Sequence, residues 1–376
     1  DAVGNALAVG RSGDESYTID RVAPAIDSIN RMTPAQALTN ASQVTFAVTF
    51  SESVTGVTVA NFVHSGTGDQ TGGSVASVGG SGTSWTVILN TAVGTGDLTA
   101  DLTQSLANIT DGAGNALAVG RSGDERYTVD RVAPGVSSIT RMTPSVTTTN
   151  ATQVTFAVGF DEVVTGLTSS NFSVSGTAEQ TAASIASVGG AGQSWTVTVN
   201  TVVGTGTLTV DLDQTLGTIV DAAANAVVAS RSGDESYTVD REVPTVSSIT
   251  RMTPADGVTN ATQVVFAVAF SETVAGVSTA NFSLRGAGDQ GTAAIDSVGG
   301  SGQSYTVSVD TVSGSGTIDL DLDQNLSSIS DTVGNALAVG RSGDEGYSVD
   351  RVAPEITAIT RMTPADATTN ATQVAF

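Results

Sequence analysis

The sequence predicts an all-β protein, a rod-like tandem array of immunoglobulin-like antiparallel β-sandwiches with about seven strands each. The tetrapeptide Arg-Met-Thr-Pro recurs with a constant step of 110 residues, which indicates a repeat array. Within a unit, apolar residues alternate with polar ones, and no segment has the amphipathic pattern of a helix. Clusters of Gly, Asn, Asp and Ser, typical of turns, separate these segments about every ten residues. The tetrapeptide begins at Arg31, Arg141, Arg251 and Arg361.

The repeat period divides the chain into three full units and two part-units. The full units are expected at 21–130, 131–240 and 241–350, and each is long enough to bury its own core. Residues 1–20 match the C-terminal part of a preceding repeat, and residues 351–376 match the N-terminal strands of a following one. We therefore expect the sequence to be a window from a longer array.

The first four strands of the first full unit are expected between the linker and the glycine-rich centre of the unit. Val-Ala-Pro starts the unit, and the first strand follows at 26–32. The second, at 43–50, alternates as QVTFAVTF. The third is expected at 57–62, after the Phe-Ser-Glu turn. The fourth, at 74–78, lies between the turn clusters GTGDQTGG and SVGGSGTS.

The last three strands are expected at 84–90, 96–104 and 127–130. The first two alternate as SWTVILN and GDLTADLTQ, and the last is the Tyr-Thr-Val-Asp segment before the next linker. Trp85 has a predicted core role on the fifth strand. The proline of the linker removes a backbone donor and stiffens the junction. The same role is predicted for the equivalents of Trp85, which are Trp195 and Tyr305.

Acidic residues are predicted to gather at the end of each unit where the chain enters. In an up-and-down count of strands, the loops after the second and sixth strands both open toward that end, where the linker also lies. Six positions, from the linker and these two loops, keep their residue type in all three full units. They are Asp20, Glu52, Asp111, Asn115, Asp124 and Glu125; Asp130, Glu162, Asp221, Asn225, Asp234 and Glu235; and Asp240, Glu272, Asp331, Asn335, Asp344 and Glu345.

Converging carboxylates repel one another unless a cation lies between them. Ca²⁺ binds six to eight oxygens from Asp, Glu, Asn and backbone carbonyls, so it is the metal we expect at these residues. A cation that bridges the linker aspartate and the loops would fix the angle between units. In the alternative, the acids are turn formers that point to water, with Asp111 closing an Asx-type turn before Gly114. Arg121 and Arg131 are also candidates for neutralising part of the cluster.

Composition limits the classes of function. The chain has no Cys, and its 14 basic residues, all Arg, face 37 acids, for a net charge of −23. Such a surface repels nucleic acid and anionic membranes and attracts cations. No apolar run is long enough to span a membrane, and no signal peptide is present in the window. The single histidine, His64, is replaced by Val174 and Leu284 in the other units, which favours an exposed strand or loop position.

We expect no enzymatic activity. The repeated residues contain no nucleotide-binding or nucleophile-elbow motif and no nucleophilic Cys. The pair Asp124 and Glu125 is similar to a glycosidase dyad, but it occurs in every unit beside a linker, so solvated or cation-bound acids are the better interpretation.

Asparagines in Asn-X-Ser/Thr triplets form a second recurring feature. Four lie in the connection between the first two strands, which faces the next unit, so we expect a junction contact or a plain turn, with glycan attachment as the alternative. These four are Asn40, Asn150, Asn260 and Asn370; further triplets begin at Asn108, Asn171, Asn281 and Asn325.

Four motifs in fixed order resemble the bacterial immunoglobulin-like repeats of very large surface adhesins and RTX-type secreted proteins. They are A-P-x-V-x-S-I-x-R, then F-S-E-x-V-x-G followed by N-F, then D-x-x-G-N, and Y-T-V-D before A-P. The resemblance covers essentially the whole chain and implies extracellular stalk repeats that bind Ca²⁺ at domain junctions. Two segments depart from these motifs. The 221–225 loop lacks the glycine of D-x-x-G-N, and the third linker has Glu242-Val243 where the others have Val-Ala. The implied ligands are the loop acids above with the linker residues Asp20, Asp130, Asp240 and Asp350.

The leading functional prediction is an extracellular, cell-surface stalk or fibre region of a large adhesin, stiffened by Ca²⁺ between neighbouring repeats. One alternative is a module that binds a glycan or a protein partner through the variable stretch 63–73 and its equivalents, 173–183 and 283–293. Another is an extracellular filament subunit that self-associates by strand exchange, with the strand at 17–20 and the C-terminal strands as the exchanged elements.

Overall fold

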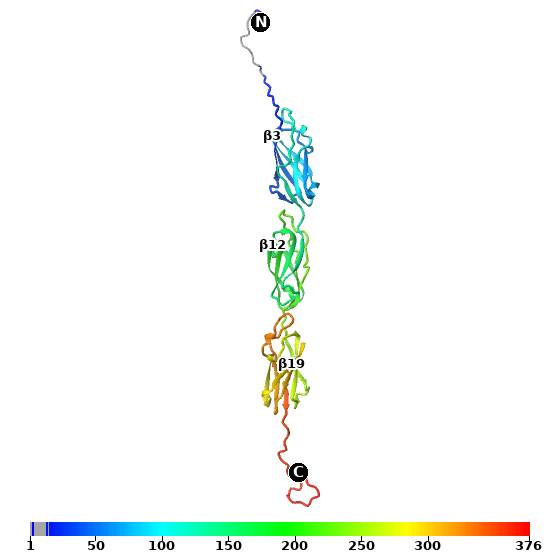
Figure 1. Cartoon of the computed structure of the whole chain (residues 1–376), viewed down its shortest axis with the longest axis vertical. Helices are drawn as coiled ribbons and strands as arrows, with labels where there is room; N and C mark the ends of the chain where they lie inside the picture. Colours follow the sequence, from blue (N-terminus) through cyan, green and yellow to red (C-terminus); the bar gives the residue numbers. More distant parts are fainter. Residues whose placement is uncertain (1, 4–12, 14) are drawn as a thin grey trace.

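The protein forms three β-sandwich units joined by short linkers, as seen in a computed structural model that describes residues 2–3, 13 and 15–376. Figure 1 shows the units one after another along the longest axis of the molecule. Each unit repeats the same order of elements. No helix among the described residues has the length and apolar character needed to cross a membrane.

The first unit defines the pattern that the other two follow. It consists of β1 (Ile26–Thr33), β2 (Leu38–Thr39), β3 (Gln43–Val54), η1 (Val59–Asn61), β4 (Phe62–Gly66), η2 (Gly68–Gly72), β5 (Ser74–Asn90), β6 (Thr95–Leu102), η3 (Leu106–Asn108) and β7 (Tyr127–Asp130).

The second unit consists of β8 (Val136–Thr143), β9 (Thr148–Thr149), β10 (Gln153–Val164), η4 (Ser169–Asn171), β11 (Phe172–Gly176), η5 (Ala178–Ala182), β12 (Ser184–Asn200), β13 (Thr205–Leu212), η6 (Leu216–Thr218) and β14 (Tyr237–Asp240). The third consists of β15 (Val246–Thr253), β16 (Val258–Thr259), β17 (Gln263–Val274), η7 (Thr279–Asn281), β18 (Phe282–Gly288), η8 (Asp289–Thr292), β19 (Ala294–Asp310), β20 (Ser315–Leu322), η9 (Leu326–Ser328) and β21 (Tyr347–Asp350).

Two sheets make up each sandwich. In the first unit one sheet has the order β1-β3-β5 and the other β2-β7-β6-β4. All pairings are antiparallel except β2 with β7, which is parallel. This is the immunoglobulin-like arrangement that the alternating pattern predicts, repeated in tandem. The two-residue strand β2 was not predicted, because a segment that short carries no periodicity.

Strand β5 folds back on itself. A straight strand of 17 residues would place its ends roughly 50 Å apart. Instead the Asn90 side chain donates a hydrogen bond to Ser74 Oγ at 3.1 Å, and Thr86 Oγ1 donates to Gly79 O at 3.3 Å. The chain reverses around Gly82, whose φ of 65° lies in the left-handed region that suits glycine. The strands predicted at 74–78 and 84–90 are therefore the two arms of one element.

The third predicted strand, 57–62, is wrong in position, because a turn takes its place. Residues Val59–Asn61 form η1, and the extended segment begins only at Phe62. The buried Asn61 causes this shift. Its Oδ1 accepts a hydrogen bond from Thr58 N at 2.7 Å, and its Nδ2 donates to Ser105 O at 3.1 Å, which closes the turn against the opposite loop.

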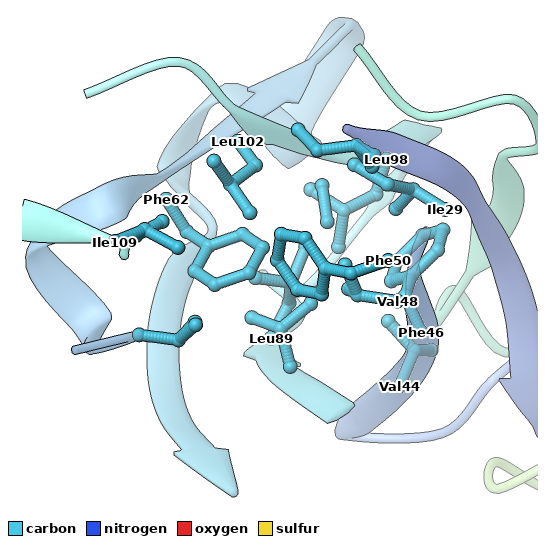
Figure 2. Packing of buried hydrophobic residues seen from close by; sticks show 14 of the residues in the cluster. Ile29, Val44, Phe46, Val48, Phe50, Phe62, Leu89, Leu98, Leu102 and Ile109 are labelled. Atoms are coloured by element: carbon cyan, nitrogen blue, oxygen red, sulfur yellow. The ribbon is translucent and has the colours of Figure 1, made fainter. Parts of the chain in front are cut away.

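The core of each unit lies between its two sheets. Figure 2 shows Phe46, Phe50 and Phe62 meeting among aliphatic side chains from both sheets in the first unit. Tyr127 is fully buried and packs edge-on against Phe46, with ring centroids 5.2 Å apart. Its hydroxyl donates to Pro34 O at 2.7 Å, which ties β7 to the connection between β1 and β2.

The predicted core role of the tryptophans is only partly correct. Trp85 is half-buried and packs against the margin of the core, while its equivalent Tyr305 is buried. The fully buried aromatic residue on the last strand of every unit was not singled out from the sequence. These residues are Tyr127, Tyr237 and Tyr347.

The described segments outside the three units have little regular structure. Residues 15–20 contain no strand, and in residues 351–376 the one isolated bridge joins Thr363 to Ala375. Ile359 is 71% exposed, whereas its equivalent Ile249 is completely buried. Neither described segment has the remaining strands of a sandwich to pair with, and isolated strand pairs are marginal in water.

Candidate metal centre at the linker

The linker aspartates Asp20, Asp130 and Asp240 each lie beside two acids of the unit that follows, whereas Asp350 is in no such group among the described residues. One carboxylate oxygen from each of the three residues lies within 4.8 Å of the other two. The arrangement occurs at the start of all three units, and we call it the linker triad. The three triads are Asp20, Glu52 and Asp111; Asp130, Glu162 and Asp221; and Asp240, Glu272 and Asp331.

Different elements position the three acids of the second triad. Asp130 is the last residue of β7, the final strand of the first unit. Its Oδ1 accepts a hydrogen bond from Val132 N at 3.1 Å, so the linker turns immediately after it. Glu162 lies near the end of the long strand β10. Asp221 follows the bridge residue Val220 and is buried, with 6% of its surface exposed.

The loop that carries Asp221 is closed by Asn225. Asn225 N donates to Asp221 Oδ1 and Asn225 Nδ2 to Asp221 Oδ2, both at 2.8 Å. Asn225 Nδ2 also donates to the backbone carbonyl of Asp130 at 2.9 Å. One amide group therefore connects the linker to the loop of the next unit. Asn115 and Asn335 make the same contacts, with Asp20 O at 3.3 Å and Asp240 O at 3.0 Å.

The asparagines that were predicted as metal ligands are oriented by hydrogen bonds to the linker and to the loop. Their side-chain nitrogens, not their oxygens, face the linker carbonyl and the neighbouring carboxylate. Asn115, Asn225 and Asn335 hold the triad in place, and they do not offer it an oxygen ligand from the side chain.

The central glutamate of each triad is in an unfavourable electrostatic environment. The pKa of Glu162 is raised above its usual 4.5, first because burial disfavours the charged form, and then because Asp221 and Asp130 are close. The pKa values of Glu52 and Glu272 are raised for the same reasons. The pKa of Asp111 is instead lowered, chiefly by the hydrogen bond from the side chain of Asn115.

No described ion pair neutralises a linker triad. Arg121 pairs with Asp124, and the guanidinium of Arg131 points to the preceding unit, where Nη1 donates to Thr91 O at 3.3 Å. The prediction that these arginines neutralise part of the cluster is therefore correct for Arg121, which pairs with the predicted cluster member Asp124, and wrong for Arg131. Three carboxylates share one small volume with no described positive group among them.

The residues of the triad fit a Ca²⁺ ion. Two oxygens bound to one Ca²⁺ at about 2.3–2.6 Å are at most about 5 Å apart, and the triad oxygens meet this limit. The donor set contains only oxygen, which suits a hard cation and disfavours metals that need nitrogen or sulfur. Asp130 Oδ2 is available for such a ligand role, because Val132 N occupies Oδ1.

The comparisons with known proteins show no family. No family model matches the sequence, and the search of curated proteins gives no match. Similar solved structures include domains 1–6 of the surface layer protein SbsC, with 15% identity over 91% of this chain and 56% of that chain, at a TM-score of 0.22. Another is invasin, described as a bacterial integrin-binding protein, with 14% identity over 87% of this chain and 59% of that chain, at a TM-score of 0.29.

This chain spans a little more than half the length of both structures. At these identities and TM-scores, the similarities carry no argument about family or function.

Two predicted members of each cluster lie elsewhere. Asp124 Oδ2 accepts a hydrogen bond from Ile29 N at 2.8 Å, and Glu125 Oε2 accepts one from Arg31 N at 2.9 Å. Both acids therefore lie along β1 and are not among the residues of the linker triad. The same is true of Asp234, Glu235, Asp344 and Glu345. The up-and-down count places the ends of the loop correctly, but it does not show that the loop runs along the first strand.

The departures in the second and third units leave the loops intact. Ala224 takes the place of Gly114 and adopts a φ of 70°, in the left-handed region, at a cost on the order of 1 kcal/mol. The turn is retained, because Ala224 N still donates to Asp221 O at 3.3 Å. In the third linker, Glu242 N donates to Asp240 Oδ1 at 3.2 Å, as Val132 N does to Asp130.

The asparagine triplets fall into two groups. Asn171 and Asn281 are completely buried and hydrogen-bonded, so a glycan cannot be attached to them in the folded protein. Asn150 lies at the junction, where its Nδ2 would be 3.6 Å from a Cβ added to Gly334 of the next unit. This short distance to the loop of the next unit agrees with the predicted place of the connection at the junction. His64 lies half-buried on β4 with Nε2 3.3 Å from Thr71 O.

Proposed function

We propose that the chain is an extracellular structural region, a stalk or surface fibre within a large adhesin, in which each linker is held rigidly by both neighbouring repeats. The observation that carries this proposal is the double attachment of the linker. Arg131 N donates to Gly94 O of the preceding unit at 3.1 Å, while Asn225 of the following unit binds Asp130 O. Of two adjacent linker residues, Asp130 is thus hydrogen-bonded to the following unit and Arg131 to the preceding unit.

The side chain of Arg131 strengthens the backward attachment. It donates to Thr91 O, and Thr91 Oγ1 in turn donates to Ala41 O at 2.7 Å in the connection between β2 and β3. The corresponding contacts of Arg241 and Arg351 have the same lengths to within 0.1 Å. A tether of this kind has few free torsions, in contrast to a Gly/Ser linker. Length and stiffness are the properties that a spacer needs, and neither requires a unique residue.

We further propose that Ca²⁺ binds the linker triads and stiffens the junctions. Two of the three carboxylates belong to one unit and the third to the linker, so a bound cation would hold them together. Sites in extracellular modules bind Ca²⁺ with Kd on the order of 0.1–1 mM. Millimolar Ca²⁺ would then stabilise each junction by about 1–2 kcal/mol. The placement outside the cell also rests on the acidic, Cys-free composition and on the resemblance to adhesin repeats.

The test is small-angle scattering and thermal unfolding of the full chain in 5 mM Ca²⁺ and in excess chelator. We expect a higher Tm and a longer, narrower particle with Ca²⁺. Asp130→Asn should remove the gain at its junction, whereas Asp296→Asn, the same change at an exposed residue on β19, should leave it intact. An equal Tm and shape in both buffers would reject the Ca²⁺ proposal. A particle that scatters as a flexible chain in both buffers would also reject the stalk.

A further inference from the structure

Strand β1 lies at the edge of its sheet, where β3 is its only partner among the described strands. The equivalent strands β8 and β15 also lie at edges. The outward N–H and C=O groups of an edge strand are a template on which a strand of another molecule can pair. In each unit of this protein, those groups have partners from the same unit.

The connection between β6 and β7 supplies these partners. Asp124 Oδ2 accepts from Ile29 N at 2.8 Å, and Asp124 N donates to Ile29 O at 3.0 Å. Glu125 Oε2 accepts from Arg31 N at 2.9 Å. Two carboxylates and one backbone N–H therefore occupy the positions that an adjacent strand would use. We call this acid pair and its equivalents the edge strap.

The edge strap has the same geometry in the other units. In the second unit the distances from Ile139 N to Asp234 and from Arg141 N to Glu235 are 2.7 and 2.8 Å. In the third unit, the corresponding distances, for the amides of Ile249 and Arg251, are 2.8 and 3.0 Å.

Arginines hold the edge strap from both sides. Arg121 forms an ion pair with Asp124, and its Nη1 donates to Ile26 O, a further outward carbonyl of β1, at 3.4 Å. Arg31 Nη2 lies 3.4 Å from Glu125 Oε1. The acids are thereby fixed along the edge, although charged side chains on a surface are normally mobile.

We propose that the edge strap prevents β1, β8 and β15 from pairing with the same strands of a second copy of this chain. The second copy is the partner that fits, because β8 and β15 have the identical sequence VSSITRMT. Like strands pair antiparallel about a two-fold axis, so each edge is complementary to itself. Several edges in one chain would add avidity to a weak single contact. The proposal is independent of the Ca²⁺ proposal and goes beyond the stalk function.

The test uses the full chain with Glu125→Ala, Glu235→Ala and Glu345→Ala together, in chelator, by analytical ultracentrifugation. We expect a concentration-dependent dimer with an apparent Kd at least tenfold below that of the unchanged protein. The matched control is Glu52→Ala, Glu162→Ala and Glu272→Ala, which removes the same number of charges and leaves the edge strap intact. A folded strap variant that sediments like the control would overturn the proposal.

A second variant and a probe keep the test decisive if the alanine variant does not fold. Glu125→Met, Glu235→Met and Glu345→Met keep a side chain of similar length and remove both the charge and the oxygen that accepts the backbone hydrogen bond. A fluorescent VSSITRMT peptide should bind this variant at least tenfold more tightly than the unchanged chain. Equal binding by both proteins would contradict the proposal.

Discussion

Each repeat carries two sets of acids with opposite surroundings, and the connection between β6 and β7 supplies residues to both sets. In the linker triad, three carboxylates face one another with no described arginine between them. In the edge strap, Asp124 and Glu125 face arginines and backbone N–H groups. Asp124 follows Asn115, the residue that holds the triad, by only nine positions.

The pKa shifts have opposite directions for this reason. The pKa of Glu162 is raised, mainly by burial and then by its acidic neighbours. The pKa of Asp234 is lowered below its usual 3.8, first by the hydrogen bond from Ile139 N and then by Arg231. The comparison teaches that the neighbours of an acid, and not its residue type or its recurrence, decide the direction in which its pKa shifts.

The largest difference between the two sets should appear on deletion of the side chains. In Asp234→Ala with Glu235→Ala, two partly buried N–H groups lose their acceptors. We expect the second repeat to lose about 2–3 kcal/mol of unfolding free energy, from about 1–1.5 kcal/mol for each hydrogen bond. The measurement is urea unfolding of the full chain in chelator at low protein concentration. Glu162→Ala is the matched change in the triad and should not destabilise; an equal loss in both variants would remove the distinction.

The response to Ca²⁺ should depend on the linker triad and not on the edge strap, the reverse of the expected order for deletion of the side chains. Asp221→Asn should abolish the Ca²⁺-dependent rise in stability of the second repeat, a change of about 1–2 kcal/mol. Asp234→Asn should keep that rise, because the edge strap offers no shared cation position. Calorimetric titration with Ca²⁺ counts the sites directly. Loss of one site in the Asp234→Asn variant would show that the two sets act together.

The pH dependence of stability should have opposite slopes for the two sets. The folded pKa of Glu162 lies above 4.5, so its contribution is most favourable below pH 4.5 and declines as the pH rises through the folded value. The folded pKa of Asp234 lies below 3.8, so its stabilisation is present above pH 3.8 and is lost as the pH falls through the folded value.

Denaturant unfolding between pH 3 and 7 without Ca²⁺, with Glu162→Gln and Asp234→Asn as references, measures these slopes. Difference curves with the same sign would contradict the assignment of the two environments.

The smallest effect on stability is expected for the arginine that joins the linker to the preceding repeat. Arg131→Ala removes a partly buried hydrogen bond to Thr91 O, so we expect a loss of about 1 kcal/mol or less. Its effect on shape should be larger, because one of the two attachments of the linker is weakened. Scattering should show a broader distribution of the angle between the first two repeats. An unchanged angular distribution would mean that the backbone contacts alone fix the junction.

The sequence was sufficient to predict the sandwich and its repetition. The alternation in 43–50 and 84–90 has period two, and the structure has strands there because one face of each meets the core. The third strand was misplaced because Asn61 forms its turn through Ser105, 44 residues away. A contact over that distance leaves no local pattern.

Of the two sets of acids, only the linker triad could be predicted from the sequence. The linker triad follows from strand direction, because the ends of the loops are fixed by the strands they join. The edge strap does not, since Glu125 and Arg31 are 94 residues apart and meet only through the path of the loop. One signal was present in the sequence: Arg121 precedes Asp124 by three residues, a spacing at which the two side chains can pair within the loop.

The division of each triad between linker and following unit has a consequence for how such a chain changes its length. The third acid of every complete triad is the last residue of the preceding unit's period, so a triad is a property of the boundary and not of either neighbour alone. Unequal recombination can insert or delete whole 110-residue periods. Each new boundary then again has a linker Asp-Arg dipeptide followed by a unit with the equivalent loops, so its triad is complete. A change in copy number by whole periods therefore keeps every boundary complete, whereas a duplication that begins or ends out of phase would break one.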